Sequence, residues 1–487
     1  MPISFNQVPS QIRVPFLYAE FDNTRAIQGL TDQPYKILMI GQKLAAGTKS
    51  ALEPVRVTSA DQAAEFFGNG SHLHLMARGN FANNQIIETV CVAIDDPGSA
   101  VAADGTITLT GTPTQSGTLS LYVAGERVQV LAEAADTVTT IATRIAAAIN
   151  AATYLPVTAT SAAGVVTVTA KNKGLVGNDI DIRLNYFDEE TPAGLTVAIT
   201  AMADGAGAPD LDTVWAALGE EQYILVCGPY NDSASIASIR EEFAERDGPT
   251  KQIDSVYITA FYGTHSEATT IGEAPNSKYG IIVPTQKSPT FAPEYAAMIV
   301  GVVANSASID PARPFQTLTV QGARAPSAKD QYNLNERNLH LYDGLSTTTV
   351  NAGGEVVIER LITTYRKNNF GADDASYLDL NTILTLSYIR YSFRTYFLQK
   401  YPRHKLANDG TRFGAGQAIM TPKVAKGECA GIFRNWETNG LVEGFTQFMD
   451  ELIVERNAED ANRLDFMLPT DLVNQLRVMG VQIQFLL

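Results

Sequence analysis

The chain has 487 residues, 45% of them hydrophobic, and is therefore long enough to bury the cores of several domains. Its formal net charge of −16 disfavours a nucleic-acid-binding protein, because proteins of that class carry a basic surface. The three cysteines, Cys91, Cys227 and Cys429, are too few for a disulfide framework, which favours a reducing compartment. The amino-terminal residues lack the pattern of a signal peptide, and the longest apolar run, 296–304, is too short to span a bilayer. We expect a soluble protein of the cytoplasm, with no membrane insertion and no nucleic-acid partner.

The first predicted elements are a strand-like arm and a buried strand. Within residues 11–22, the apolar residues Ile12, Val14 and Phe16 alternate with Arg13 and Pro15, as in a strand. The prolines at 9 and 15 restrict this stretch to a sheet edge or an arm. Residues 35–41 form a near-continuous hydrophobic run closed by glycine, which is typical of a strand covered on both faces. A short strand at 55–57 follows, then a helix from Ser59 to Gly68 and another that begins after Ser71 and reaches Met76.

A stretch of different composition lies between Pro97 and Pro209. It contains eighteen Thr and only fifteen charged residues. Residues 105–110 and 164–169 alternate Thr with aliphatic residues and predict half-exposed strands. Between them Asp136 is the expected N-cap of a helix with one apolar stripe: Val138, Ile141, Ile145 and Ile149. The stretch therefore predicts a small β-rich domain that carries one helix.

Beyond Pro209 helices and buried strands alternate again. Helices are predicted at 210–219 and 233–246, and strands at 222–228 and 255–261, which favours a mostly parallel sheet. The buried strands at 35–41 and 222–228 indicate that one core is built from both sides of the inserted domain. Further on, we expect a strand at 356–362 and helices at 379–400 and 421–438. The last seven residues, 481–487, alternate as a strand does.

No stretch of the sequence has a catalytic signature. Residues 41–50 resemble a phosphate loop but have one residue too many between the glycines and Thr in place of Lys, so a surface turn explains them better. His72 and His74 would lie on different faces of the predicted helix, which makes them poor joint metal ligands. No GxSxG, HExxH or Cys/His pair is present. We expect no catalytic residue, no cofactor and no metal site.

One region is basic within this acidic chain. From Arg390 to Arg434 there are nine basic residues against Asp409 and Glu428, a local charge of +7. Two interpretations stay open from the residues alone. The region is either a solvated surface or a docking surface for an acidic partner.

Several short sequence segments occur together along the chain. They are YKILMIGQKLAAG at 35–47, ADQAAEFFGNGS at 60–71, KGLVGN at 173–178, ERNL at 336–339 and EVVIERLITTY at 355–365. In their order and spacing they resemble the contractile-tail sheath proteins of Mu-like bacteriophages, and the resemblance spans nearly the whole chain.

The resemblance implies a structural protein of the virion with a multidomain α/β (α+β) fold and extended terminal strand arms. Its domains would be an amino-terminal arm (1–22), a sheath core in two parts (23–97 and 208–330) around the inserted β-rich domain (98–207), a carboxy-terminal sheath domain (331–477) and a carboxy-terminal strand arm (478–487). Such proteins assemble in the host cytoplasm as stacked six-subunit rings around a tail tube. Their contraction drives the tube through the host envelope for genome ejection. The implied partners are further copies of the chain, the tail tube protein, and the baseplate and tail terminator proteins.

The resemblance also implies roles for particular residues. Lys423, Lys426 and Arg434 would face the tail tube, since the tube-contacting helix of the family lies in this part of the carboxy-terminal domain. Both terminal arms would pair with neighbouring subunits through their apolar positions, which at the carboxy terminus are Val481, Ile483, Phe485 and Leu487. From periodicity alone, an edge strand in the chain's own sheet explains 481–487 equally well. A tail adhesin or carbohydrate-binding module, suggested by the Thr-rich insert, and an α/β hydrolase with an unrecognised site are the alternative functions.

Overall fold

The computed structural model describes residues 33–414 and 416–486, which form two compact units. Of the described residues, the larger unit contains Pro34–Ser387 with 474–486, and the smaller contains Tyr388–Val473 with Gln33. The predicted amino-terminal arm with Ile12, Val14 and Phe16 lies outside the described residues, as does Leu487.

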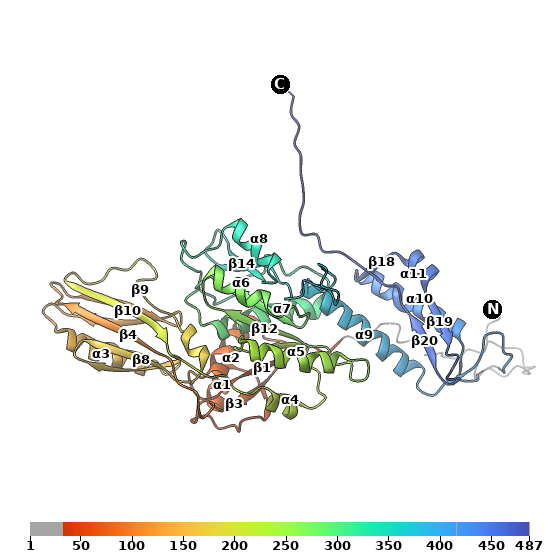
Figure 1. The fold of residues 1–487 in the computed structure, drawn as a ribbon, viewed down its shortest axis with the longest axis horizontal. Helices are drawn as coiled ribbons and strands as arrows, with labels where there is room; N and C mark the ends of the chain where they lie inside the picture. Colours follow the sequence, from red (N-terminus) through yellow and green to blue (C-terminus); the bar gives the residue numbers. More distant parts are fainter. Residues whose placement is uncertain (1–32, 415, 487) are drawn as a thin grey trace, which may run out of the picture. The chain divides into compact units, whose positions relative to one another are not determined.

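A six-stranded sheet forms the centre of the larger unit, in the order β13-β12-β11-β1-β3-β2 (Figure 1). Its strands are β1 (Lys36–Gln42), β2 (Pro54–Val57), β3 (Glu88–Ile94), β11 (Leu225–Cys227), β12 (Val256–Phe261) and β13 (Gly280–Pro284). All neighbours are parallel except β2 and β3, and β1 pairs with β3 on one side and with β11 on the other. These pairings confirm a mostly parallel sheet that is built from both sides of the Thr-rich stretch.

Both faces of this sheet are covered, as the near-continuous hydrophobic run of β1 predicts. Leu38 and Ile40 belong to the same core cluster as Trp215 and Phe243, whereas Ile37 and Met39 pack in a second cluster. The helices of this part of the chain are α1 (Ala60–Phe67), α2 (His72–Asn83), α4 (Asp212–Leu218), α5 (Ser233–Asp247), α6 (His265–Glu273) and α7 (Ala292–Ile309).

The helix signals in the sequence were largely correct. The side chains of Ser59 and Ser71 accept hydrogen bonds from backbone N–H groups of α1 and α2, which confirms both as N-caps, although α2 continues beyond Met76.

The apolar run 296–304 lies in α7, which packs on α2 where glycines allow close approach. A Cβ added at Gly79 would lie 2.6 Å from the carbonyl oxygen of Glu294. Among the described residues, no helix is long and apolar enough to cross a membrane.

The Thr-rich stretch folds as two antiparallel sheets and a helix. Strands β4 (Asp104–Gly111), β7 (Val157–Ala162), β8 (Val165–Ala170) and β10 (Leu195–Ala203) form one sheet, and β5 (Gly117–Val123), β6 (Glu126–Ala132) and β9 (Ile182–Leu184) form the other. Helix α3 (Val138–Ala151) buries Ile141, Ile145 and Ile149, as expected. Its N-cap is Thr137 rather than Asp136, because the Thr137 hydroxyl accepts the N–H of Thr140 while Asp136 binds Arg144. A single 3-10 turn, η1 (Leu175–Asp179), follows β8.

The remainder of the larger unit contains α8 (Leu334–Tyr342), the hairpin β14 (Thr347–Val350) and β15 (Val356–Arg360), and the start of α9 (Leu380–Lys400). Residues 473–486 have no regular secondary structure. The strand predicted at 481–487 is therefore absent over 481–486, because a strand requires a partner for its backbone groups and the chain's own sheets supply none there.

The smaller unit contains the end of α9, α10 (Pro422–Thr438), α11 (Phe445–Glu451) and three two-stranded sheets. These sheets pair β16 (Lys405–Leu406) with β17 (Ile419–Met420), β18 (Val442–Glu443) with β21 (Asp471–Leu472), and β19 (Ile453–Arg456) with β20 (Leu464–Met467). An aromatic core holds the unit together. Phe433 stacks on Phe448 with 4.2 Å between ring centroids, and the indole N–H of Trp436 donates to the Ser392 hydroxyl at 3.0 Å.

Candidate functional site

The carboxy-terminal segment is held at one point and then leaves the surface of its unit. The guanidinium of Arg477 donates to Asp379 and to the side-chain oxygen of Asn381, both at 3.1 Å. Asp379 also accepts two hydrogen bonds from Arg360, at 3.0 and 2.9 Å. Arg477 is therefore an anchor at the base of the segment, because it binds Asn381 and a half-buried carboxylate, Asp379, that Arg360 also holds in place.

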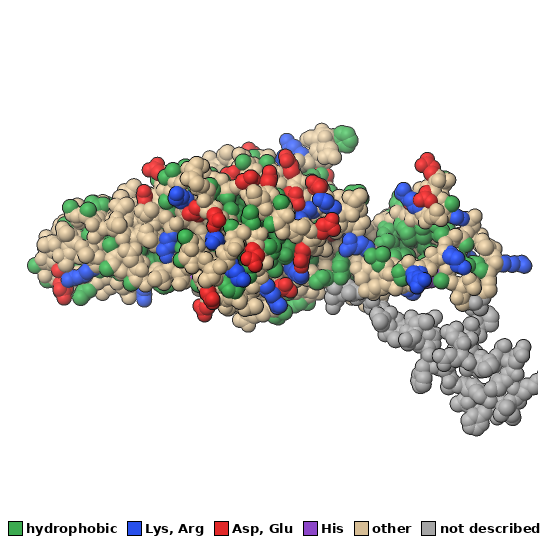
Figure 2. Space-filling model, turned by 90° about the horizontal axis from the view of Figure 1, so that it is seen from below, with side chains coloured by type: hydrophobic (Ala, Val, Ile, Leu, Met, Phe, Trp, Pro, Cys, Tyr) green, Lys and Arg blue, Asp and Glu red, His purple; other side chains and the backbone are tan. Residues whose placement is uncertain are grey.

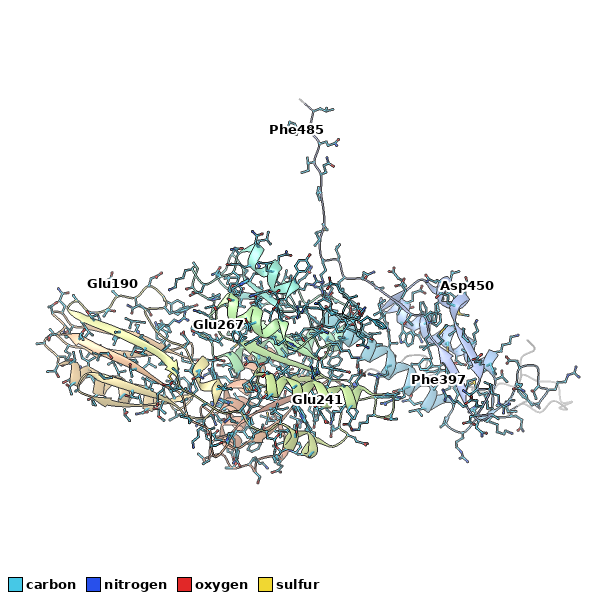
Figure 3. The ribbon with its side chains drawn as sticks, viewed as in Figure 1. Glu190, Glu241, Glu267, Phe397, Asp450 and Phe485 are labelled. Atoms are coloured by element: carbon cyan, nitrogen blue, oxygen red, sulfur yellow. The ribbon has the colours of Figure 1, made fainter. Side chains whose placement is uncertain are left out.

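Beyond Arg477 every described residue, 478–486, is exposed. Val481 and Phe485 have exposed fractions of 82% and 78%, and Figure 3 shows the Phe485 side chain with no other element of the larger unit beside it. The alternating apolar positions Val481, Ile483 and Phe485 thus have no partner within the described part of the chain. Soluble proteins rarely leave so many contiguous large apolar side chains in water unless the surface has a partner.

Helix α10 places the predicted basic residues on its solvent side. The Thr421 hydroxyl caps the helix, and its inward face buries Ala425, Cys429, Ile432, Phe433 and Trp436. Lys423 and Arg434 are exposed and Lys426 is half-buried. Their spacings of three and eight residues allow one face, and Figure 2 shows several Lys and Arg side chains on the surface of this unit, at the right of the view.

The three basic side chains differ in their contacts. Within residues 33–414 and 416–486 the Lys423 ammonium makes no hydrogen bond or ion pair, while its backbone N–H donates to Asp409 at 3.0 Å. The Lys426 ammonium donates to the carbonyl of Leu452 at 2.9 Å. Arg434 pairs with Glu437 at 2.6 Å, and its guanidinium carbon lies 3.4 Å from the centroid of the Phe445 ring. Lys423 is therefore the side chain most available to a partner.

Two glycines lie on the same exposed face of α10. A Cβ added at Gly427 or Gly431 would have no heavy atom within 4 Å, and neither residue has a positive φ. Neither packing nor backbone geometry within the subunit therefore requires glycine there. Each glycine nevertheless costs about 1 kcal/mol of helix stability relative to alanine.

The smaller unit also presents open strand edges. Each of its three sheets has only two strands, so each strand leaves one row of backbone N–H and C=O groups without a ladder partner among the described residues. Isolated two-stranded sheets are marginally stable, and a third strand stabilises them.

No candidate for a metal centre emerges. The described residues contain no group of three or more His, Cys, Asp or Glu side chains that could hold a metal ion. His72 and His74 are instead buried helix residues, and burial lowers their pKa values to about 3 and about 4. The His74 ring accepts the N–H of Gly70 at 2.9 Å, which gives it a structural role at the start of α2.

Comparisons with known proteins decide the family. Residues 204–364 match the model of the phage tail sheath protein central domain, and residues 372–485 match the phage tail sheath C-terminal domain. The chain is 44% identical over 488 residues to the Mu-like prophage FluMu tail sheath protein of Haemophilus influenzae strain Rd, and the match covers 100% of both chains. The chain belongs to the phage tail sheath family. The predicted resemblance is confirmed, and the chain is a structural protein of a phage contractile tail.

Solved sheath proteins are more distant from this sheath chain. The sheath tail protein of Desulfitobacterium hafniense is 11% identical, with a TM-score of 0.49 and coverage of 95% of this chain and 100% of that one. The sheath of an extracellular contractile injection system, PVC, in its contracted state is 10% identical, with a TM-score of 0.49 and coverage of 98% of each chain.

Sequence reasoning missed three features of these sheath surfaces. The anchor Arg477, the pair Gly427 and Gly431, and the contact of Arg434 with Phe445 were not predicted. A weak signal existed for Arg477, because it is the only charged residue in the last sixteen positions of the chain. The two glycines interrupt an otherwise good helical pattern, which is a signal for a functional reason when no cap or turn explains it.

Proposed function

We propose that this chain polymerises with copies of itself into stacked six-subunit rings around a tail tube, and that contraction of this sheath drives the tube through the host envelope. The polymer would be assembled in the host cytoplasm and meet the tube, baseplate and tail terminator proteins. Within it, the inserted domain 98–207 would lie on the outside of the sheath. Family membership supports this proposal over an adhesin.

The observation that carries the proposal is the anchored and exposed carboxy-terminal segment. Burial of Val481, Ile483 and Phe485 against a neighbour would contribute about 1.5–3 kcal/mol per side chain. The same segment would use its free backbone groups to extend a sheet of that neighbour. Arg477 would hold the base of the segment, so that less conformational entropy is lost when the neighbour captures it.

The open strand edges of the smaller unit are the acceptors that we propose for the arms. Adding a strand would satisfy exposed backbone groups and convert a marginal two-stranded sheet into a three-stranded one. Main-chain hydrogen bonds would then tie each subunit to its neighbours, and whole subunits could rotate as rigid bodies without breaking these ties. The amino-terminal arm with Ile12, Val14 and Phe16 would act in the same way.

The tube contact that we propose is the exposed face of α10. Lys423, Lys426 and Arg434 would meet an acidic tube surface, since complementary charges steer and register association. Gly427 and Gly431 lie between these cations on the same face and would let the tube approach the helix backbone closely. This role would explain why the helix keeps two glycines that its own packing does not require.

The arm proposal is tested by changing one face of the terminal segment at a time. The triple variant V481S/I483S/F485S should fold with an unchanged thermal unfolding temperature, because these side chains are exposed and pack on no other element of the described chain. It should fail to form polymers in sedimentation and negative-stain microscopy. The matched control Q482S/Q484S, which alters the opposite face, should polymerise like the unaltered chain. Polymers of normal length from the triple variant would contradict the proposal.

A further inference from the structure

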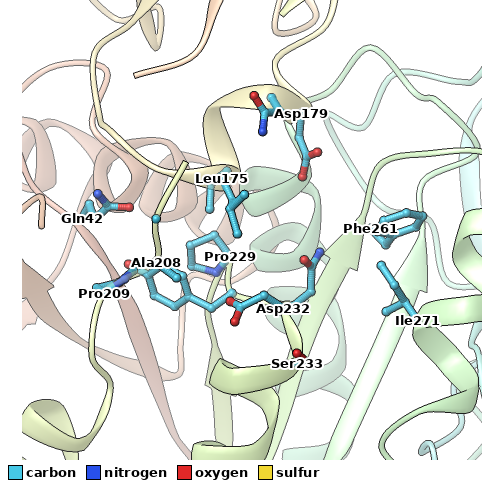
Figure 4. Close-up of a pocket in the computed structure, with 15 residues that line it drawn as sticks. Gln42, Leu175, Asp179, Ala208, Pro209, Pro229, Asp232, Ser233, Phe261 and Ile271 are labelled. Atoms are coloured by element: carbon cyan, nitrogen blue, oxygen red, sulfur yellow. The ribbon is translucent and has the colours of Figure 1, made fainter. Parts of the chain in front are cut away.

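A cavity of about 320 Å³ lies at the carboxyl edge of the central sheet, where the inserted domain meets it (Figure 4). The cavity touches the last residue of β1, Gln42, and the last residue of β12, Phe261, as well as the loop 229–233 after β11. The inserted domain contributes η1 and the returning segment 207–209. All of these parts belong to the larger unit.

The strand order places the cavity where the winding of the sheet reverses direction. From β1 the chain proceeds to β3 on one side, and from β11 it proceeds to β12 and β13 on the other, so the direction of winding reverses between β1 and β11. Open parallel sheets commonly bind ligands in the crevice at the carboxyl ends of the strands where this reversal occurs. The volume of the cavity is at the small end of the range for ligand pockets.

Two buried polar atoms at this cavity have no hydrogen-bond partner among the described residues. They are the amide oxygen of Gln42 and the hydroxyl of Tyr230, whose side chains have exposed fractions of 1% and 2%. The amide nitrogen of Gln42 is satisfied by Asp96 at 2.6 Å and by the carbonyl of Lys173 at 2.8 Å, which fixes the orientation of the amide. Figure 4 shows its oxygen turned toward the cavity. An unpaired buried polar atom costs about 1–3 kcal/mol, so a ligand or ordered water with a donor would be stabilised there.

A carboxyl group enters from the opposite side. Asp179 of η1 has no hydrogen bond or ion pair among residues 33–414 and 416–486, and Figure 4 shows it directed into the cavity. Burial raises the pKa of Asp179 to about 7. The apolar walls include Leu175, Pro229 and Ile271, and Leu175 is 44% exposed, so the cavity is open to solvent on that side.

The charges around the cavity determine whether it favours a cation or an anion. The ionisable side chains that line the cavity are Asp179, Asp232 and Tyr230. The lining residues that come from β1, β12, α6 and 207–209 are not ionisable. Strand β10, which packs on η1, contributes no residue to the lining. Helix α5 begins here, and a helix N-terminus alone would favour an anion. The carboxylate of Asp232 already occupies that position, since it accepts the N–H of Ser235 at 3.1 Å. No Lys or Arg of the described residues lines the cavity, so the two carboxyl groups outweigh the helix end and favour a cation.

We propose that this cavity binds a small organic cation, namely a primary ammonium on a compact apolar body. The ammonium would donate to Asp179, and the body would lie on Leu175, Pro229 and Ile271. Binding would ionise Asp179 and release its proton to solvent. This site is independent of polymerisation and of the proposed tube contact.

Benzylamine is a suitable probe, measured by isothermal titration calorimetry on the full chain. We expect a dissociation constant of about 0.1–1 mM, the range that a ligand of this size can reach. Because the ammonium pairs with the ionised form of Asp179, binding should be about ten-fold tighter at pH 8 than at pH 6. At pH 7 the heat should depend on the ionisation enthalpy of the buffer, which reports the released proton.

Variants and ligand analogues separate the possible outcomes. Asp179→Asn should abolish both the binding and its pH dependence, while Asp204→Asn, which changes an exposed carboxyl of the inserted domain that does not line the cavity, should leave both unchanged. Benzyl alcohol and benzoate should bind at least ten-fold more weakly than benzylamine. Equal binding of benzyl alcohol, preferential binding of benzoate, or no heat with benzylamine in the full chain would each overturn the proposal.

Discussion

His340 shows how one buried side chain can set the acid stability of this chain. Its ring stacks on that of His265 with 4.0 Å between centroids, and burial lowers the pKa of His340 to about 4. The unfolded chain binds this proton at an ordinary pKa near 6.5, so the stability contributed by His340 is present above that pH and is lost as the pH falls toward 4. We expect the free energy of unfolding to fall by about 2 kcal/mol between pH 7.5 and pH 5 on account of His340 alone.

Urea unfolding of the unassembled subunit at these two pH values measures this effect. His340→Gln retains a polar side chain that does not titrate, so the difference in unfolding free energy between the two pH values should be smaller in the variant by that amount. The same pH dependence in both proteins would show that His340 already binds its proton in the folded chain.

Gly427 and Gly431 provide a second test at single positions. Both lie in α10 with open space at the site of a Cβ, so G427A/G431A should stabilise the unassembled subunit by about 1–2 kcal/mol. The same change should weaken tube association, because two methyl groups would separate the helix from the tube. Urea unfolding and co-sedimentation with tubes measure the two effects. A variant that is more stable and binds tubes normally would exclude close approach at this face.

Helix α10 as an element tests the proposed tube contact through its charge. The variant K423E/K426E/R434E should weaken tube association roughly ten-fold or more at low salt while sparing sheath–sheath contacts. A matched triple on the larger unit, R127E/R240E/K251E, makes the same change in net charge and should bind tubes normally. Because Lys426 and Arg434 also contact Leu452 and Phe445, thermal unfolding must accompany the binding assay. Equal tube binding by both triples would rule out this face.

The elements differ in how far the sequence predicted them. Local signals were sufficient for the caps Ser59 and Ser71 and for the buried strands β1 and β11, because cap chemistry and hydrophobic periodicity act over a few residues. The cap of α3 was assigned one residue too early, since Asp136 and Thr137 both offer a suitable oxygen and only the three-dimensional structure decides between them.

Features made by contacts that are distant in sequence could not be predicted. The pairing of Ile37 with Leu225 joins strands on either side of the inserted domain, and periodicity contains no information on partners. The same reason applies to the anchor between Arg477 and Asp379 and to the cavity, where Gln42, Asp179 and Tyr230 meet only once the sheet and the insert have folded.

For the whole molecule, the central proposal is that the exposed terminal segment 478–486 joins each subunit to a neighbour. The described larger unit buries both faces of its central sheet without using residues 478–486, so these residues are not needed to complete that core. Self-association through such segments is therefore expected to rise with protein concentration while the fold of each subunit is retained.

Negative-stain electron microscopy of the purified full chain at increasing concentration tests this claim most directly. We expect long hollow tubes whose averaged end views show six-fold symmetry, and we expect V481S/I483S/F485S to give only separate subunits under the same conditions. Uniform small particles at every concentration and salt tested, from protein with intact termini, would contradict this claim.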